Sequence, residues 1–127
     1  MTEIKKKILI VEDSVTLLRI LTTKLLGEGF DVLEARNGQE GLGIALKQHP
    51  DLILLDIVMP KMDGITMLKE LRHDEWGQKA VVMVLTNLSY AKETLNEMES
   101  GVYDFLVKSN WKLEDVVAKI REKLGVS

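Results

Sequence analysis

Four short apolar runs of the chain share one pattern, in which a continuous apolar stretch ends abruptly in a polar side chain. The runs cover residues 8–11, 52–55, 80–85 and 105–107, and the residues that follow them are Glu12-Asp13, Asp56, Thr86 and Lys108. Continuous runs of this length are typical of strands that are buried on both faces, as in a parallel sheet. A fifth and weaker run at residues 30–35 contains Asp31 and Glu34, which indicates a strand at the edge of the sheet.

Apolar residues at helical spacing fill the intervals between these runs. The first four helical patterns end close to helix-stopping residues, which are Gly27, Pro50, Gly77 and Gly101. The last pattern lies on one face of a single helix and consists of Leu113, Val116, Val117, Ile120 and Leu124. Strands that alternate strictly with helices predict an α/β fold, with a five-stranded parallel sheet, right-handed crossovers and five helices on both faces.

The polar residues that end the strands are the candidate functional residues. In open parallel sheets, ligands bind beyond the carboxyl ends of the strands, so we expect Glu12, Asp13, Asp56, Thr86 and Lys108 to meet at one edge. Converging carboxylates repel one another unless a cation neutralises them. Oxygen donors without cysteine or histidine suit a hard cation, of which Mg²⁺ is the most available.

The same residues suit phosphoryl transfer, in which catalysis is mostly positioning and charge neutralisation. Asp56 is the expected nucleophile and would form an acyl phosphate. Thr86 would add a hydroxyl group and Lys108 a positive charge.

Each of these residues also has a simpler interpretation when it is taken alone. Asp13 or Ser14 could cap the first helix, Asp56 could be a loop carboxylate, and Lys108 could be a solvated charge. Their coincidence at the ends of separate strands favours a shared site. The sequence has no phosphate-binding glycine loop of the G-x-x-x-x-G-K-[ST] type, and residues 56–58 lack the second aspartate of the D-x-D phosphatases.

Composition narrows the class of protein further. A length of 127 residues fits one domain, expected over residues 1–127. The chain has no cysteine, which excludes disulfides and thiolate metal sites, and its net charge of −3 argues against direct nucleic-acid binding. No apolar run approaches the roughly 20 residues that span a bilayer, and no signal-peptide segment is present. We therefore expect a cytoplasmic protein without membrane contact.

Several segments resemble the receiver domain of bacterial two-component response regulators, the CheY-like family. They cover residues 8–13, 35–41 and 51–64, together with the strand ends at Thr86 and Lys108. The resemblance extends over essentially the whole chain. It implies a flavodoxin-like doubly wound sheet with the strand order 2-1-3-4-5.

The resemblance also implies roles for individual residues. Asp56 matches the phosphoacceptor of the family. Asp13 matches its direct metal ligand, Glu12 a ligand acting through water, and Val58 the residue whose backbone carbonyl completes the protein's share of the Mg²⁺ site.

Three further roles concern the switch that follows phosphorylation. Lys108 matches the lysine that pairs with the phosphoryl oxygens, Thr86 the hydroxyl that moves toward them, and Phe105 the aromatic residue that turns inward. In the family these movements alter the face made by the fourth helix, the fifth strand and the fifth helix. We expect that two copies could form a homodimer through this face, with Asp104 of one copy near Lys119 of the other.

The sequence therefore predicts a signalling switch. A histidine kinase or phosphotransfer protein would donate the phosphoryl group to Asp56, and a downstream effector domain or protein would respond to the altered face. Beyond self-catalysed phosphotransfer and dephosphorylation, no enzyme activity is expected. Two alternatives stay open: a receiver-like interaction module that does not turn over phosphate, and a metal-dependent phosphohydrolase.

Overall fold

The computed structural model describes residues 5–56, 64–86, 104–107 and 112–126 of the chain. Its strands form one parallel sheet in the order β2-β1-β3-β4-β5, which confirms the predicted fold class and strand order. The strands are β1 (Lys7–Val11), β2 (Asp31–Ala35), β3 (Leu52–Asp56), β4 (Val82–Thr86) and β5 (Asp104–Val107).

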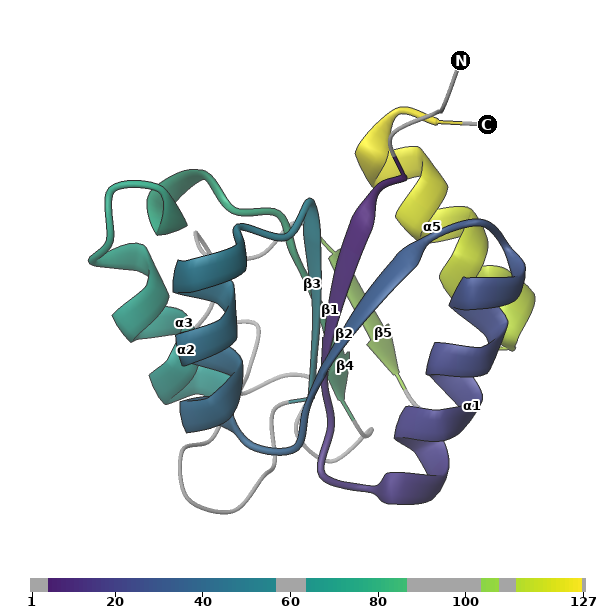
Figure 1. Ribbon diagram of the computed structural model, residues 1–127, viewed down its shortest axis with the longest axis horizontal. Coiled ribbons are helices and arrows are strands. Elements are labelled where there is room, and N and C mark those ends of the chain that lie inside the picture. Colours follow the sequence, from purple (N-terminus) through teal and green to yellow (C-terminus); the bar gives the residue numbers. More distant parts are fainter. Residues whose placement is uncertain (1–4, 57–63, 87–103, 108–111, 127) are drawn as a thin grey trace.

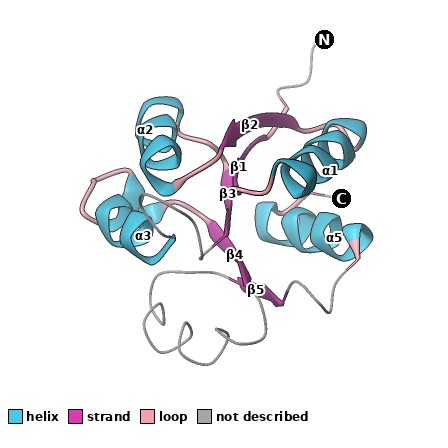
Figure 2. Ribbon diagram, turned by 90° about the horizontal axis from the view of Figure 1, so that it is seen from below, coloured by secondary structure: helices cyan, strands magenta, loops and turns pink. Residues whose placement is uncertain are grey.

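Helices cover both faces of this sheet, with α2 and α3 on one face and α1 and α5 on the other (Figure 1, Figure 2). The described helices are α1 (Val15–Gly27), α2 (Gly38–Gln48), α3 (Gly64–Arg72), the short 3₁₀ helix η1 (Gly77–Lys79) and α5 (Leu113–Leu124). The fourth predicted helix lies outside the described residues. In the described part of the chain, no helix is both long enough and apolar enough to cross a bilayer.

Two apolar cores form because successive side chains of a strand point to opposite faces. Leu9, Ile53 and Val84 pack with α2 and α3, whereas Ile8, Leu54 and Met83 pack with α1 and α5. The central strands β1 and β3 therefore contribute to both cores, as their continuous apolar runs predicted. The edge strand β2 is half-exposed, which agrees with its acidic residues.

One element boundary differs from the sequence pattern. The apolar run at residues 80–85 begins at Ala80, but β4 begins at Val82, because the Ala80 N–H donates to the Gly77 carbonyl and ends η1. The helix α2 ends at Gln48, close to Pro50 as expected, and its C-cap His49 adopts the left-handed conformation with φ 47°. The His49 ring stacks on Trp76 with centroids 4.3 Å apart, so this exposed histidine packs against the segment between α3 and η1.

Charged side chains hold α5 against α1. The Arg121 guanidinium donates to the Glu28 carboxylate and to the Glu28 backbone carbonyl, both at 3.0 Å. Lys24 lies 3.6 Å from Glu28 and 3.7 Å from Glu114. The hydrogen bond from Arg121, together with the charge of Lys24, lowers the pKa of the Glu28 carboxyl below its ordinary value. The contribution of this carboxylate to stability is therefore present at neutral pH and is lost only as the pH falls through the lowered pKa.

The chain enters β1 and leaves α5 at the same end of the molecule (Figure 1). We call this end of the sheet the amino edge, because all five parallel strands begin there. The opposite end, at which the strands finish, is the carboxyl edge.

Glycine is required where the segment after α3 folds back on the helix. A Cβ atom at Gly77 would lie 1.9 Å from the carbonyl oxygen of Leu71. The Gly77 N–H also donates to the Asp74 carboxylate at 2.8 Å, which fixes the backbone at this position. The backbone would therefore have to move to accept any larger residue.

We expect Gly77→Ala to lower the free energy of unfolding by roughly 1–3 kcal/mol, because the added methyl group overlaps a backbone atom. The matched control is Gly43→Ala in α2, where the added methyl group meets nothing within 4 Å. That change should be neutral or raise stability by up to about 1 kcal/mol. Urea unfolding of the three proteins measures both effects, and an equal stability of the two variants would contradict the steric argument.

Candidate functional site

The strand register brings the predicted polar residues to the carboxyl edge. Val11 lies opposite Leu55, so the residues that follow them, Glu12 and Asp56, are neighbours across β1 and β3. Asp56 is itself the last residue of β3 and lies opposite Leu85. The convergence predicted from the sequence is therefore confirmed for the ends of β1 and β3.

Three carboxylates meet at this edge, and we call Glu12, Asp13 and Asp56 the carboxylate cluster. One oxygen from each lies within 4.8 Å of the others. Glu12 is fully buried and Asp56 is 4% exposed, whereas Asp13 is exposed to solvent. The cluster therefore has a buried base and an open side.

Backbone hydrogen bonds position the end of β1. The Glu12 N–H donates to the Ala35 carbonyl at 3.0 Å and extends the pairing with β2 by one residue. One Glu12 carboxylate oxygen accepts a hydrogen bond from the Ser14 N–H at 3.0 Å. The Ser14 hydroxyl in turn accepts from the Leu17 N–H at 3.3 Å and caps α1. The cap is thus Ser14 and not Asp13, which leaves the simpler interpretation of Asp13 unsupported.

The donor set of the cluster fits a hard divalent cation. The three side chains are acidic and lie close together, so a divalent cation between them would offset the repulsion of their charges. All three side chains offer oxygen only, which is the donor type that Mg²⁺ binds in proteins. Glu12, Asp13 and Asp56 are therefore the described residues that could hold Mg²⁺.

The remaining predicted site residues are described only in part. Thr86 ends β4 and lies opposite Val107, and Phe105 lies within β5, so both backbone positions agree with the prediction. The side chains of Thr86 and Phe105, and all of Val58 and Lys108, lie outside the described residues. Their roles stay predictions.

One charged residue at the carboxyl edge was not identified from the sequence. Arg36 directly follows β2, and with Asp13, Asn37 and Glu40 it lines a cavity of about 340 Å³. The same rule that identified Asp56, a polar residue directly after a strand, would have identified Arg36. The weak apolar pattern of β2 concealed it.

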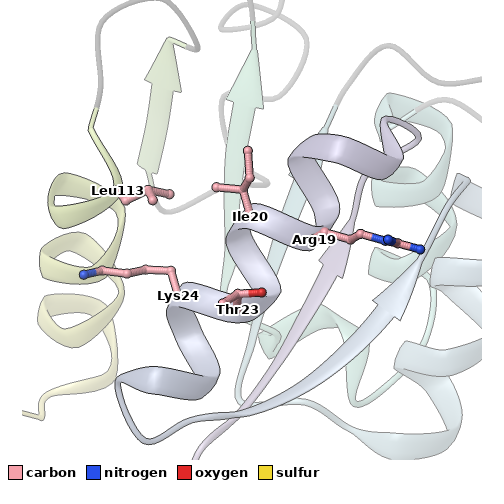
Figure 3. Close-up of a pocket in the computed structure, with 5 residues that line it drawn as sticks. All are labelled: Arg19, Ile20, Thr23, Lys24 and Leu113. Carbon is pink, nitrogen blue, oxygen red and sulfur yellow. The ribbon is translucent and has the colours of Figure 1, made fainter.

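A second cavity lies between α1 and α5 and shares no lining residue with the first (Figure 3). It measures about 400 Å³ and is lined by Arg19, Ile20, Thr23, Lys24 and Leu113. None of these residues belongs to the carboxylate cluster. Ile20 is 45% exposed there, so this helical face carries apolar surface next to the cationic side chains of Arg19 and Lys24.

Comparison with known proteins identifies the family to which the chain is similar. The family described as the response regulator receiver domain matches residues 8–121. The chain is 37% identical over 120 residues to the probable transcriptional regulator ycf27 of Porphyridium aerugineum, covering 94% of this chain and 48% of that protein. It is 34% identical over 118 residues to the DNA-binding dual master transcriptional regulator RpaA of Synechocystis, covering 93% and 48%. The chain thus spans about half the length of these relatives.

Solved structures agree with the sequence relatives. The chemotaxis response regulator CheY4 of Vibrio cholerae has a TM-score of 0.86 at 25% identity, covering 94% of this chain and 99% of that one. The receiver domain of the sensor histidine kinase PA1611 from Pseudomonas aeruginosa has a TM-score of 0.87 at 25% identity, covering 96% and 99%. The latter structure is described with a magnesium ion coordinated in its active site cleft.

We expect Asp56→Asn to raise the melting temperature of the metal-free protein. The substitution removes one charge from three carboxylates whose oxygens lie within 4.8 Å of one another, which relieves roughly 1 kcal/mol of mutual repulsion. Thermal unfolding in the presence of a chelator measures the change. Asp31→Asn, an exposed carboxylate at the start of β2, is the control and should leave the melting temperature almost unchanged. A lower melting temperature for Asp56→Asn would show that the cluster is not under electrostatic strain.

Proposed function

Because the chain belongs to the response regulator receiver domain family, we propose that it is a phosphorylation-controlled switch in which Asp56 is the phosphoacceptor. The main support is the position of Asp56, which ends a central strand, is buried, and lies within 4.8 Å of the Glu12 and Asp13 carboxylates. This combination gives one carboxylate a fixed orientation beside a set of metal-ligating oxygens.

The reaction transfers one phosphoryl group. A carboxylate oxygen of Asp56 attacks the phosphorus of the donor, a P–O bond forms, and the bond from phosphorus to the donor breaks. With a phosphohistidine donor, the leaving imidazole nitrogen keeps the electron pair of the P–N bond and takes up a proton. The product is an acyl phosphate on Asp56.

Glu12, Asp13 and Asp56 would hold Mg²⁺, with the Val58 backbone carbonyl as the remaining protein ligand. The cation would neutralise charge on the cluster and on the incoming phosphoryl oxygens. The protein's own contribution is positional: the backbone pairing of Glu12 with β2, its hydrogen bond from Ser14, and the buried end of β3 fix the carboxylates before the donor arrives.

The response to phosphorylation would involve the ends of β4 and β5. Lys108 would pair with the phosphoryl oxygens, Thr86 would donate its hydroxyl to them, and Phe105 would turn inward. Phosphorylation would thereby favour a second arrangement of the face that includes β5 and α5, which is a shift between two states. A homodimer formed through this face is one outcome of such a shift, with Asp104 and Lys119 as the expected pair.

The partners follow from this mechanism. A histidine kinase or phosphotransfer protein would supply the phosphoryl group, and an effector domain or protein would read the altered face. The relative from Synechocystis is named a DNA-binding regulator, and the chain matches 48% of its length, so the output of a related protein can be transcriptional. We place the protein in the cytoplasm, where phosphohistidine donors are formed, and propose no activity beyond its own phosphorylation and dephosphorylation.

We expect the wild-type protein to gain the mass of one phosphoryl group when it is incubated with Mg²⁺ and a small acyl-phosphate donor, and Asp56→Asn to gain none. Asparagine preserves the size of the side chain but lacks the nucleophilic carboxylate. Mass spectrometry of the intact proteins measures the result, and Asp31→Asn should be phosphorylated like the wild type. A wild-type protein that gains no mass would favour the interaction module, and sustained release of phosphate would favour the hydrolase. Phosphorylation of Asp56→Asn would place the acceptor elsewhere.

We expect Mg²⁺ to raise the melting temperature of the wild-type protein and Asp13→Ala to abolish this rise. A ligand that binds only the folded state stabilises it by about 2.7 kcal/mol at a hundredfold excess over its Kd. Thermal unfolding with and without Mg²⁺ measures the effect, and Asp31→Ala at the amino edge is the control for loss of an exposed carboxylate. An undiminished rise in Asp13→Ala would place the cation at another site.

A further inference from the structure

Arg36 is a positively charged residue at the carboxyl edge. It directly follows β2, the strand that pairs with β1. Ala35, the last residue of β2, lies opposite Val11 and accepts a hydrogen bond from the Glu12 N–H at 3.0 Å. Neighbouring strands are about 4.8 Å apart, so the backbone of Arg36 lies roughly one strand spacing from that of the Glu12-Asp13 segment. The pairing of β1 with β2 therefore places the backbone of Arg36 next to the end of β1, and its side chain lines the same cavity as Asp13.

The cavity next to the cluster contains charges of both signs. It is lined by Asp13 of the cluster, by Arg36, by Asn37 and by Glu40, in the first turn of α2. The Asn37 side-chain oxygen is engaged in capping α2, because it accepts a hydrogen bond from the Glu40 N–H at 2.8 Å. The electrostatic character of the cavity is thus set by Asp13, Arg36 and Glu40.

Arg36 is not committed to a structural ion pair. Its side chain is exposed, and among the described residues it lies within 4.0 Å of no carboxylate oxygen, whether in the cluster or elsewhere. Arg121, by contrast, makes two hydrogen bonds to Glu28 and packs over Phe30. An unconstrained arginine can move toward the carboxylates when they lack a cation and away from them when a cation is bound.

We propose that Arg36 is a resident counter-charge of the carboxylate cluster, which stabilises the metal-free protein and lowers its affinity for Mg²⁺, and that Glu40 in the same cavity opposes it. This inference rests on the proposed Mg²⁺ site. The physical reason is Coulombic: a positive charge near the cluster attracts the carboxylates and repels a divalent cation, and a negative charge does the reverse. The balance of Arg36 and Glu40 then sets the Mg²⁺ concentration at which the site is half filled.

The size of the effect follows from distance and screening. In a solvent-exposed cavity, removal of one positive charge should strengthen binding of a divalent cation by about two- to fivefold at low salt. The effect should shrink toward nothing at about 1 M salt, where the Debye length is only about 3 Å. A solvated surface arginine without this role would show no such change.

The experiment is a calorimetric titration of the full chain with Mg²⁺ at low salt. Arg36→Gln should lower the Kd by about two- to fivefold, Glu40→Gln should raise it by a similar factor, and Arg36→Lys should retain the wild-type value. The matched control is Lys47→Gln in the last turn of α2, which also removes one positive charge but at the end of the helix far from Arg36. Its Kd should equal that of the wild type.

A second measurement separates this role from a general change in packing. Without metal, Arg36→Gln should have a lower melting temperature than the wild type, and in saturating Mg²⁺ the difference should shrink or reverse. If the wild-type protein does not bind Mg²⁺, the proposed metal site fails and the inference fails with it. If the wild type binds Mg²⁺ but Arg36→Gln has the same Kd as Lys47→Gln, or Arg36→Gln and Glu40→Gln shift the Kd in the same direction, the inference alone is overturned.

Discussion

Repulsion among three carboxylates at the end of a buried sheet is the constraint on which the functional part of this structure depends. Glu12 and Asp56 are almost completely buried, and with Asp13 they place oxygens within 4.8 Å of one another. Such an arrangement persists only if the surrounding fold holds it and a positive charge compensates it. The rest of the molecule supplies the first of these requirements, and the oxygen donors of the cluster suit a divalent cation that would supply the second.

The fold holds the cluster by covering β1 and β3 on both faces. Close approach of α2 to β1 is part of this arrangement: a Cβ atom at Gly41 would lie 2.8 Å from a methyl carbon of Val11, directly before Glu12. The Ser14 cap then starts α1 two residues after Glu12 and binds its carboxylate through the backbone. The sheet thus brings the acidic residues to one edge, and helix packing and capping help to fix the end of β1 there.

Much of this could be predicted from the sequence, because buried parallel strands have an unmistakable apolar pattern and their ends share one edge. The convergence of Glu12, Asp13 and Asp56 followed from that rule alone. What could not be predicted depends on contacts between distant segments. The left-handed end of α2 at His49 accompanies stacking on Trp76, and the late start of β4 depends on η1. Arg36 was missed because β2, as a half-exposed edge strand, has too few apolar residues to mark its own end.

The placement of the two chain ends has a consequence for modularity. The chain enters β1 and leaves α5 at the amino edge, on the side of the molecule that faces away from the carboxyl edge (Figure 1). A domain joined at either end would therefore leave the carboxyl edge, where Asp56 ends β3, sterically open. It would also have to sense a change at that edge indirectly, through elements such as α5, whose 12 residues extend about 18 Å along the sheet. The same domain could accordingly be joined to further domains of very different shape, since neither chain end lies at the carboxyl edge.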